Sequence, residues 1–429
     1  MPNKQPSAPG KTKAKDKNWL KSLGPGLITG ASDDDPSGIG TYSQVGAQGG
    51  MGMLWTIIYS FPMMVAIQLV SAQIGRVTGA GIAGNMRKYY PRWVMFTLVL
   101  LMLCANIINI GADIAAMGEA ANLVLGGNMI IYAVILTLIS VTMQVFIPYS
   151  KYVFVLKWLC LVLFTYVAVV FSVRVPWLDA ISNSLLPTVT LDSANITMII
   201  AVLGTTISPY LFFWQASEEV EDEEDNPNEH PLKQAPHEAK KQFSRIRKDT
   251  VIGMAFSNLI AFFIMLCAAV TLHMNGITNI QSASQAAEAL RPIAGNLTFT
   301  LFAIGIIGTG LLALPVLAGS AAYAVCEMFL LPMGLNKRPK EAKKFYGLIA
   351  SITFFGMLII FIGINPIKAL FWSAVINGVV AVPIMILMML MGRNKKVMGK
   401  FTLTTRTTII GWISTIIMFA AAIGMFLTL

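Results

Sequence analysis

The sequence predicts an all-α polytopic membrane protein with eleven transmembrane helices. Of its 429 residues, 55% are hydrophobic and only 12% are charged, whereas soluble domains carry about 25% charged residues. The apolar residues also form runs long enough to cross a bilayer, which takes about 20 residues. This composition argues against a soluble protein with a polar surface. The predicted spans are 25–46, 51–75, 93–121, 128–148, 150–173, 195–217, 250–273, 298–329, 345–363, 367–391 and 406–428.

The basic residues predict the direction of these spans. Nearly all of the 31 Lys and Arg residues lie in the N-terminal segment or in every second connection, and the exceptions are Arg174, Arg291 and Lys368. Cytoplasmic connections carry an excess of Lys and Arg. We therefore expect a plasma or inner membrane protein with a cytoplasmic N-terminus and an external C-terminus. The net charge of +10 then reflects topology and indicates no nucleic-acid partner.

The chain divides into two helical halves. The predicted regions are a basic cytoplasmic N-terminus at 1–24, five helices at 25–173, an extracellular loop at 174–194, five further helices at 195–391, and a loop with the eleventh helix at 392–429. The loop at 174–194 could lie in the membrane interface as an amphipathic helix.

A charged cytoplasmic loop is predicted at 218–249, inside the second half. It begins with the acidic run from Glu218 to Asp225. This run is either a solvated, partly disordered linker or an acidic surface that concentrates or senses Mg²⁺.

Two spans carry residues that interrupt a helix. The first reads GPGLITGASDDDPSGIGTYS around Pro36, and the sixth reads VLGTTISPYLFFWQAS around Gly204 and Pro209. They are five spans apart, so they run in opposite directions, as an inverted repeat requires. Paired interrupted helices in corresponding halves indicate a transporter site near the membrane midplane. The alternative is two simple kinks, because Pro and Gly are frequent in membrane helices.

Acidic residues within spans are candidates for function, because an acid at the centre of a membrane helix costs about 2.5–3.5 kcal/mol. Asp35 precedes Pro36, where the helical hydrogen-bond ladder is open. A carboxylate beside free carbonyls at a half-helix end can form a cation site. Asp33 and Asp34 could instead line a water-filled vestibule. Asp113 lies deep in the third span and is a further candidate.

Two other acids lie nearer the span ends. Glu119 is close to the outer end of span three, and Glu327 ends span eight. For both we expect a solvated side chain. Asn377 in span ten is polar at depth, and either faces the site or forms a hydrogen bond across helices.

At DPSG (Asp35 to Gly38) and TTISPYLFF (Thr205 to Phe213) the chain resembles the NRAMP family of divalent-metal transporters. The GPG of span one, the GAD of span three and the YAVCEMF of span eight extend the resemblance. It implies a LeuT-like fold of two inverted five-helix repeats plus one helix, with helices 1 and 6 discontinuous. It also implies a metal site at Asp35, Gly38, Thr205 and Ser208.

The chain departs from the family at several of these positions. The family's Asp-Pro-Gly-Asn motif reads Asp-Pro-Ser-Gly in this chain and ends in Gly38. The family's Met-Pro-His motif reads Ser208, Pro209 and Tyr210. A thioether favours transition metals, so its replacement by Ser208 leaves hard oxygen ligands. Gly38 removes a side chain and should enlarge the site. Because Mg²⁺ keeps much of its water, we expect a site for hydrated Mg²⁺, with Mn²⁺ also accepted, as in NRAMP-related magnesium transporters.

The groups that would carry protons are also changed. A second family histidine falls on Gln215, and the second acid of helix three is Ala116. This favours an uncoupled facilitator, since a doubly charged ion gains about 4.6 kcal/mol across 100 mV, twice the value per charge. The alternative is a proton-coupled Mn²⁺/Fe²⁺ importer in which Asp35 and Asp113 still carry protons. The second-tier positions for the pore or for coupling are Ser37, Asp113, Tyr210, Gln215 and Asn377.

Other classes of function fit the sequence less well. In a sodium-coupled amino-acid transporter, Asp35 would repel the substrate carboxylate. We find no nucleophile motif, phosphate loop or closed metal-ligand set, so we do not expect an enzyme. A sensor or scaffold gives no reason for two matched breaks. We expect no resident cofactor and no obligatory protein partner; the predicted partners are the divalent cation and the lipid bilayer.

Overall fold

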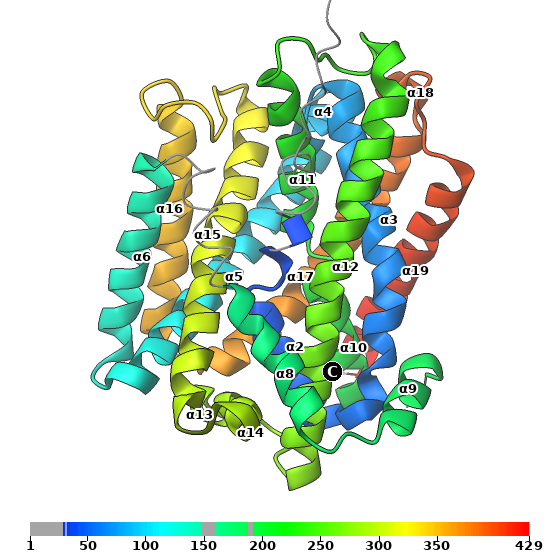
Figure 1. The fold of residues 1–429 in the computed structure, drawn as a ribbon. Helices are drawn as coiled ribbons and strands as arrows, with labels where there is room; N and C mark the ends of the chain where they lie inside the picture. Colours follow the sequence, from blue (N-terminus) through cyan, green and yellow to red (C-terminus); the bar gives the residue numbers. More distant parts are fainter. Residues whose placement is uncertain (1–28, 31, 148–159, 188–191, 429) are drawn as a thin grey trace, which may run out of the picture.

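Long apolar helices run between the two ends of the molecule in the computed structural model (Figure 1). The structure describes residues 29–30, 32–147, 160–187 and 192–428. Within these residues, nine helices are long and apolar enough to cross a membrane. A tenth span results if Leu161–Ser172 and Trp177–Leu185, bent by 120°, count as one. The count of eleven stays a prediction, because parts of spans one and five lie outside the described residues.

The first half of the chain contains the interrupted first helix and the helices that surround it. Its helical elements are residues 29–30 with 32–33, α2 (Pro36–Gly49), η2 (Gly50–Met53), α3 (Trp55–Thr78), α4 (Ile82–Tyr89), α5 (Arg92–Leu125), α6 (Met129–Phe146), η3 (Cys160–Leu163), α8 (Phe164–Ser172) and α9 (Trp177–Leu185). The α9 helix lies in the predicted loop 174–194, so a helix does form there.

The second half contains the interrupted sixth span and the last helices. Its helical elements are α10 (Ser193–Thr206), α11 (Pro209–Glu224), η4 (Pro236–Glu238), α12 (Ala239–Thr271), η5 (His273–Asn275), α13 (Ala283–Ala287), η6 (Glu288–Leu290), α14 (Arg291–Ala294), η7 (Gly295–Leu297), α15 (Thr298–Phe329), α16 (Lys343–Leu358), η8 (Ile359–Ile362), α17 (Pro366–Arg393), α18 (Lys395–Met398) and α19 (Thr405–Thr428).

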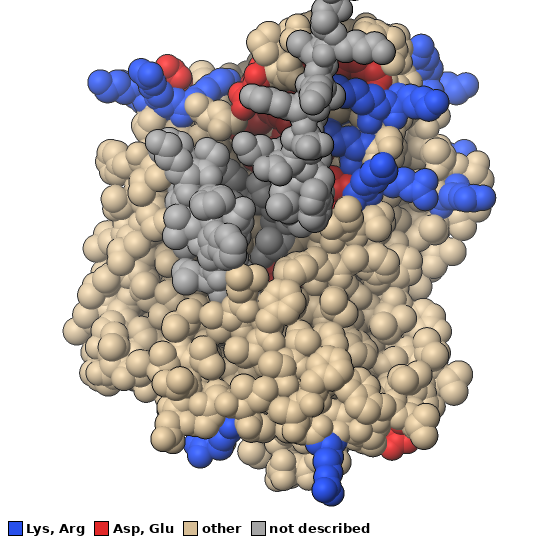
Figure 2. All heavy atoms as spheres, viewed as in Figure 1, with Lys and Arg blue, Asp and Glu red and all other residues tan. Residues whose placement is uncertain are grey.

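Charged and apolar side chains divide the surface into zones. Lys and Arg gather at the end that carries α4 and α18, and a broad middle zone of the visible face carries few charges (Figure 2). Large apolar side chains are exposed on the outer helices, among them Phe171, Phe355 and Ile416. An exposed apolar belt of this kind suits contact with lipid rather than with water.

Glycines allow the interrupted helices to pack closely on their neighbours. A Cβ atom at Gly204 would lie 2.1 Å from the carbonyl oxygen of Ala374, so α10 approaches α17 backbone to backbone. A Cβ atom at Gly46 would lie 2.3 Å from the carbonyl oxygen of Met265 and would similarly separate α2 from α12. Small residues at helix contacts are typical of membrane proteins. These contacts hold α10 close to α17 and α2 close to α12.

The acidic run Glu218 to Asp225 is not a loop, contrary to the sequence prediction. Helix α11 continues to Glu224, and α12 begins at Ala239. Glu219 is fully buried and pairs with Arg245 of α12. Arg76 of α3 pairs with Asp222 at 3.6 Å. The sequence alone did not show that cations from two other helices pair with Glu219 and Asp222 of this run.

The sequence suggested a solvated side chain for Glu327, and the structure contradicts this. Only 5% of the residue is exposed. Its carboxylate accepts hydrogen bonds from the backbone N–H groups of Gly81 and Gly84, the latter at 2.9 Å. These groups belong to the first turn of α4, whose N–H groups have no partner within the helix. Glu327 thus joins the end of α15 to α4.

Candidate transport site

The first break is centred on Asp34 and Asp35. Residues 32–33 are helical, the next two are not, and α2 restarts at Pro36. Proline suits the first helical position because its missing N–H would have no helical partner there. The Asp35 carboxylate caps α2 by accepting a hydrogen bond from the Gly38 N–H, at 2.6 Å. Its second oxygen accepts one from Asn109 Nδ2 of α5, at 3.0 Å.

A second carboxylate meets the same helix end. Asp113 of α5 accepts a hydrogen bond from the Ser37 N–H at 3.1 Å. The Ser37 hydroxyl donates to the Leu370 carbonyl of α17 at 3.3 Å and lies 3.1 Å from Ser373 Oγ. The N-terminus of a helix carries a partial positive charge. The start of α2 therefore holds two buried carboxylates with backbone N–H groups.

The second break lies between α10 and α11, at Ile207 and Ser208. The Ser208 hydroxyl donates to the carbonyls of Gly204, at 2.7 Å, and Thr205, at 2.9 Å. The Ser208 hydroxyl therefore caps the C-terminal end of α10 in this structure. The carbonyl of Thr205, one of the predicted site residues, accepts this hydrogen bond.

The two breaks touch each other. The Tyr210 hydroxyl at the start of α11 donates to the Ser32 carbonyl at 3.4 Å. The Thr29 hydroxyl donates to Gln215 Oε1 at 2.7 Å, further along α11. Tyr210 thus lies at the breaks, whereas the Gln215 hydrogen bond joins the two half-helices away from Asp35.

Oxygen atoms from both breaks converge at Gly38. A Cβ atom there would lie 3.1 Å from the carbonyl oxygen of Asp33, and 3.4 Å from both Asp35 Oδ1 and Thr205 Oγ1. Asp35, Gly38 and Thr205 are therefore neighbours, as the predicted site requires. The expected enlargement of the site by Gly38 is not present, because the neighbouring oxygens close around the missing side chain.

The two other aspartates of the first break are buried rather than exposed to a vestibule. Asp33 and Asp34 are each 1% exposed. The Ser257 hydroxyl of α12 lies 2.6 Å from Asp33 Oδ2 and 3.3 Å from Asp34 Oδ1. Of the two expectations for these residues, a water-filled vestibule is not what this structure shows.

Several buried side-chain oxygens of this region accept no hydrogen bond from the described residues. Asp33 Oδ1, Asp34 Oδ2, Asn109 Oδ1 and Asp113 Oδ2 are buried and accept no hydrogen bond from the described residues. The ion pairs found in the described part of the chain include none of these aspartates and not Asp35. A buried charge without a partner is costly. The region is therefore suited to take up cations or protons.

Asn109 and Ser257 are among the residues of this region that sequence reasoning missed. Asn109 lies four residues before Asp113 on α5, so the two share a helix face, and this spacing could have identified it. Ser257 gives no such signal.

Asn377 is buried, and its Oδ1 accepts no hydrogen bond from described residues. A hydrogen bond across helices, one of the two interpretations of Asn377, is therefore not confirmed for that oxygen.

Comparison with protein families shows to which family the chain belongs. The family model described as "Natural resistance-associated macrophage protein-like", Nramp, matches residues 26–428. The chain belongs to the Nramp family. It is thus an integral, multi-pass membrane transporter, and the prediction that it is not an enzyme is confirmed by this membership.

Two relatives show how distant this Nramp chain is from curated members. Both are named "Divalent metal cation transporter MntH". The one from Klebsiella pneumoniae (strain 342) is 25% identical over 405 residues, which cover 92% of this chain and 91% of the relative. The one from Yersinia pestis (strain Pestoides F) is 25% identical over 401 residues, 91% of each.

Solved structures confirm the LeuT-like fold that the Nramp resemblance implied. The Eremococcus coleocola manganese transporter, in complex with an aromatic bis-isothiourea substituted compound, matches with a TM-score of 0.75 and 15% identity, over 96% of this chain and 88% of that one. The nucleobase-cation-symport-1 family transporter Mhp1, in a closed conformation, matches with a TM-score of 0.59 and 13% identity, over 95% and 92%.

Proposed function

We propose that this Nramp chain transports divalent metal cations across a membrane, with Mg²⁺ as its preferred ion and Mn²⁺ also accepted. The observation that carries this proposal is the group of buried aspartates at the first break, which lack cationic partners among the described residues. A cation passing through the region would balance their charge. The relatives named divalent metal cation transporters support the class of ion.

The donor atoms favour a hard ion. Asp33, Asp35 and Thr205 present oxygen atoms around Gly38. Ser208 occupies the position at which the family resemblance places a methionine. Hard oxygen ligands suit Mg²⁺ and Mn²⁺, whereas thioethers favour softer ions. We propose Asp35, Thr205 and Ser208 as ligands, direct or through water, with Gly38 allowing their approach.

The absence of histidine at two positions favours transport without protons. Tyr210 and Gln215 replace the histidines implied by the family resemblance, and histidine is the side chain whose ordinary pKa lies near neutrality. The membrane potential is sufficient to drive a doubly charged ion inward. We further propose that the Lys- and Arg-rich end faces the cytoplasm.

Proton-coupled Mn²⁺ or Fe²⁺ import is the second candidate, and the comparisons favour it. The matched Eremococcus coleocola structure is named a manganese transporter. Asp113 also keeps an oxygen that accepts no hydrogen bond from the described residues, and such an oxygen could hold a proton.

Flux measurements in proteoliposomes distinguish these functions. The purified protein would be reconstituted with an internal Mg²⁺ dye in one set and a pH dye in another, under an inside-negative potential. We expect Mg²⁺ uptake that grows with the potential and no acidification above protein-free vesicles. Mn²⁺ uptake with matching acidification, without Mg²⁺ uptake, would establish the second candidate instead.

A further inference from the structure

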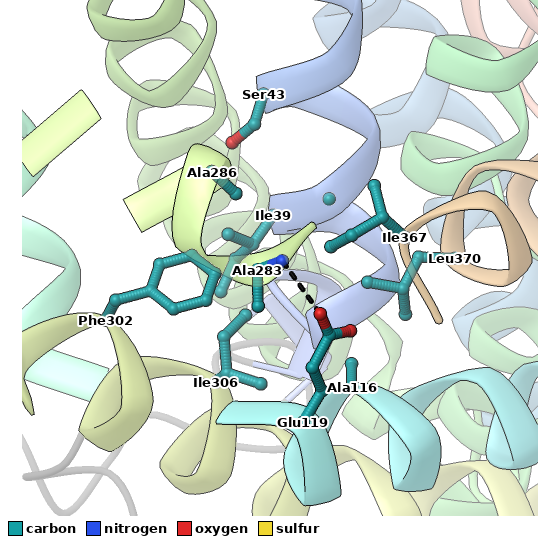
Figure 3. Close-up of a pocket in the computed structure, with 11 residues that line it drawn as sticks. Ile39, Ser43, Ala116, Glu119, Ala283, Ala286, Phe302, Ile306, Ile367 and Leu370 are labelled. Atoms are coloured by element: carbon teal, nitrogen blue, oxygen red, sulfur yellow. Dashed lines mark hydrogen bonds between the residues drawn. The ribbon is translucent and has the colours of Figure 1, made fainter. Parts of the chain in front are cut away.

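A small enclosed cavity lies beside α2, on the side away from the acidic run of α11. It has a volume of about 10 Å³ and is enclosed by residues of α2, α5, α13, α15 and α17 (Figure 3). Such a volume holds about one water molecule. Most of its lining is apolar, with Ile39, Phe302, Ile306 and Ile367 among the side chains, and Ser43 and Glu119 contribute the polar groups.

Glu119 directs its carboxylate into this cavity (Figure 3). Its Oε1 accepts a hydrogen bond from the Ala283 N–H of α13, at 2.9 Å. Its Oε2 is buried and accepts no hydrogen bond from the described residues. Glu119 also takes part in none of the ion pairs found in that part of the chain. A carboxylate in largely apolar surroundings is unfavourable unless something else compensates its charge.

The cavity adjoins the transport site. Ala116, which also lines it, lies between Asp113 and Glu119 on α5. Leu370 lines the cavity with its side chain, while its carbonyl accepts the hydrogen bond from Ser37. Ile39 of the lining follows directly on Gly38. The cavity is therefore the next space along α2 from the convergent oxygens, in the direction of α13.

We propose that Glu119 forms a second cation subsite, which receives a divalent cation before it reaches Asp35. Helix α13 acts as a cover over this subsite, held shut by the hydrogen bond from Ala283 to Glu119. When the cover opens, both carboxylate oxygens face the incoming ion. When the ion moves on to Asp35, Glu119 binds Ala283 again. This inference rests on the divalent-cation transport proposed above, but not on which ion is preferred.

The test separates the charge of Glu119 from its hydrogen bond. Glu119→Gln keeps an oxygen acceptor for the Ala283 N–H but removes the charge, and Glu119→Asp keeps the charge. Initial uptake rates would be measured in proteoliposomes against ion concentration, with Mg²⁺ and Mn²⁺ in parallel. For Glu119→Gln we expect the KM to rise about tenfold, the size of one charge-assisted contact, with the maximal rate within about twofold of wild type. Glu119→Asp should restore most of the KM.

The matched control is Glu288→Gln, which removes a charge from the neighbouring η6 element. Glu288 pairs with Arg291, and its side chain is 31% exposed; we expect its KM to stay at the wild-type value. A wild-type KM for Glu119→Gln would overturn the subsite, as would a fall in maximal rate alone. If the wild type carries Mn²⁺ but not Mg²⁺, the preference for Mg²⁺ fails while the Mn²⁺ series still tests Glu119.

Discussion

Two groups of buried acids in this chain are compensated in opposite ways. Around the end of α11, acidic side chains pair with cations: the buried Glu219 pairs with Arg245, and Glu229, which follows the helix and is 14% exposed, pairs with Arg76 and lies 3.6 Å from Lys241. At the first break, Asp33 and Asp35 are held by neutral donors, among them Ser257 Oγ and backbone N–H groups.

The difference separates structural from functional charge. A buried ion pair is complete within the protein, and the loss of one partner destabilises the fold. A buried carboxylate with only neutral donors keeps a net charge, which costs stability but attracts a cation. Removal of an acid should therefore impair transport at the first break, and removal of a cation should impair stability near α11.

The largest expected effect is that of Asp35→Asn on transport. The amide keeps an oxygen that can accept from Gly38 but removes the charge, so we expect the rate of ion uptake in proteoliposomes to fall by about 100-fold or more, the upper range for one contact to a charged group. The matched control is Asp222→Asn, because Asp222 is 44% exposed and Arg76 keeps Glu229 as partner. Equal losses in both variants would refute the distinction between the two groups.

The next effect is that of Arg76→Met on stability. The Arg76 side chain is fully buried and pairs with Asp222 and Glu229. Its replacement leaves these acids with fewer partners, and breaking a buried pair costs about 3–5 kcal/mol. We expect a lower melting temperature in detergent. Asp35→Asn should not lower it, since that change removes an uncompensated charge. A lower melting temperature for Asp35→Asn alone would reverse the assignment of the two groups.

A smaller effect is expected on ion preference when Ser208 at the second break is replaced. Ser208→Met supplies a thioether, which favours Mn²⁺ over Mg²⁺. We expect the ratio of Mn²⁺ to Mg²⁺ uptake to rise by about tenfold, equivalent to about 1.4 kcal/mol. Ser208→Ala is the matched control, because it also loses the hydrogen bonds to Gly204 and Thr205 but adds no sulfur. The same ratio in both variants would show that Ser208 caps α10 and does not select the ion.

Much of the fold could be predicted because the bilayer constrains it. Spans must be long and apolar, so helices such as α5 and α17 can be predicted from a single sequence. The breaks at Pro36 and Pro209 can be predicted because proline interrupts the helical hydrogen-bond ladder. The end of α11 could not be predicted in this way, since Glu219 pairs with Arg245, which lies 26 positions later in the sequence. Pairing at such a distance leaves no local pattern.

The candidate site was predictable in part for the same reason. Asp35, Gly38 and Thr205 lie on the two breaks, and the breaks meet. Asn109 and Ser257 reach the site from other helices, and which polar residue of α12 faces inward depends on packing. The orientation of the Ser208 hydroxyl toward α10 could not be predicted either, because it depends on which carbonyls the break leaves without hydrogen-bond partners.

The smallest effect concerns acid stability in the paired group. Burial opposes ionisation of Glu229, but the hydrogen bond and charge of Arg76, with the charge of Lys241, outweigh it and hold the pKa of that carboxyl below its ordinary value. A lowered pKa stabilises the folded state above the unfolded pKa of about 4.3, and this contribution is lost as pH falls through the folded pKa. Glu229→Gln should therefore melt at a lower temperature than wild type at neutral pH.

The difference between the two melting curves should hold from pH 7 to about pH 5. It should shrink as the pH falls from about 4.3, where the unfolded carboxyl takes up a proton, through the lower folded pKa. The measurement is the melting temperature in detergent over this range. Lys241→Gln is the companion variant: it leaves Arg76 in place, and the Lys241 side chain is 79% exposed, so its effect should be the smaller. A difference that grows toward acid pH would mean that Glu229 is better bound when protonated, and that the acids near α11 are no more compensated than those at the first break.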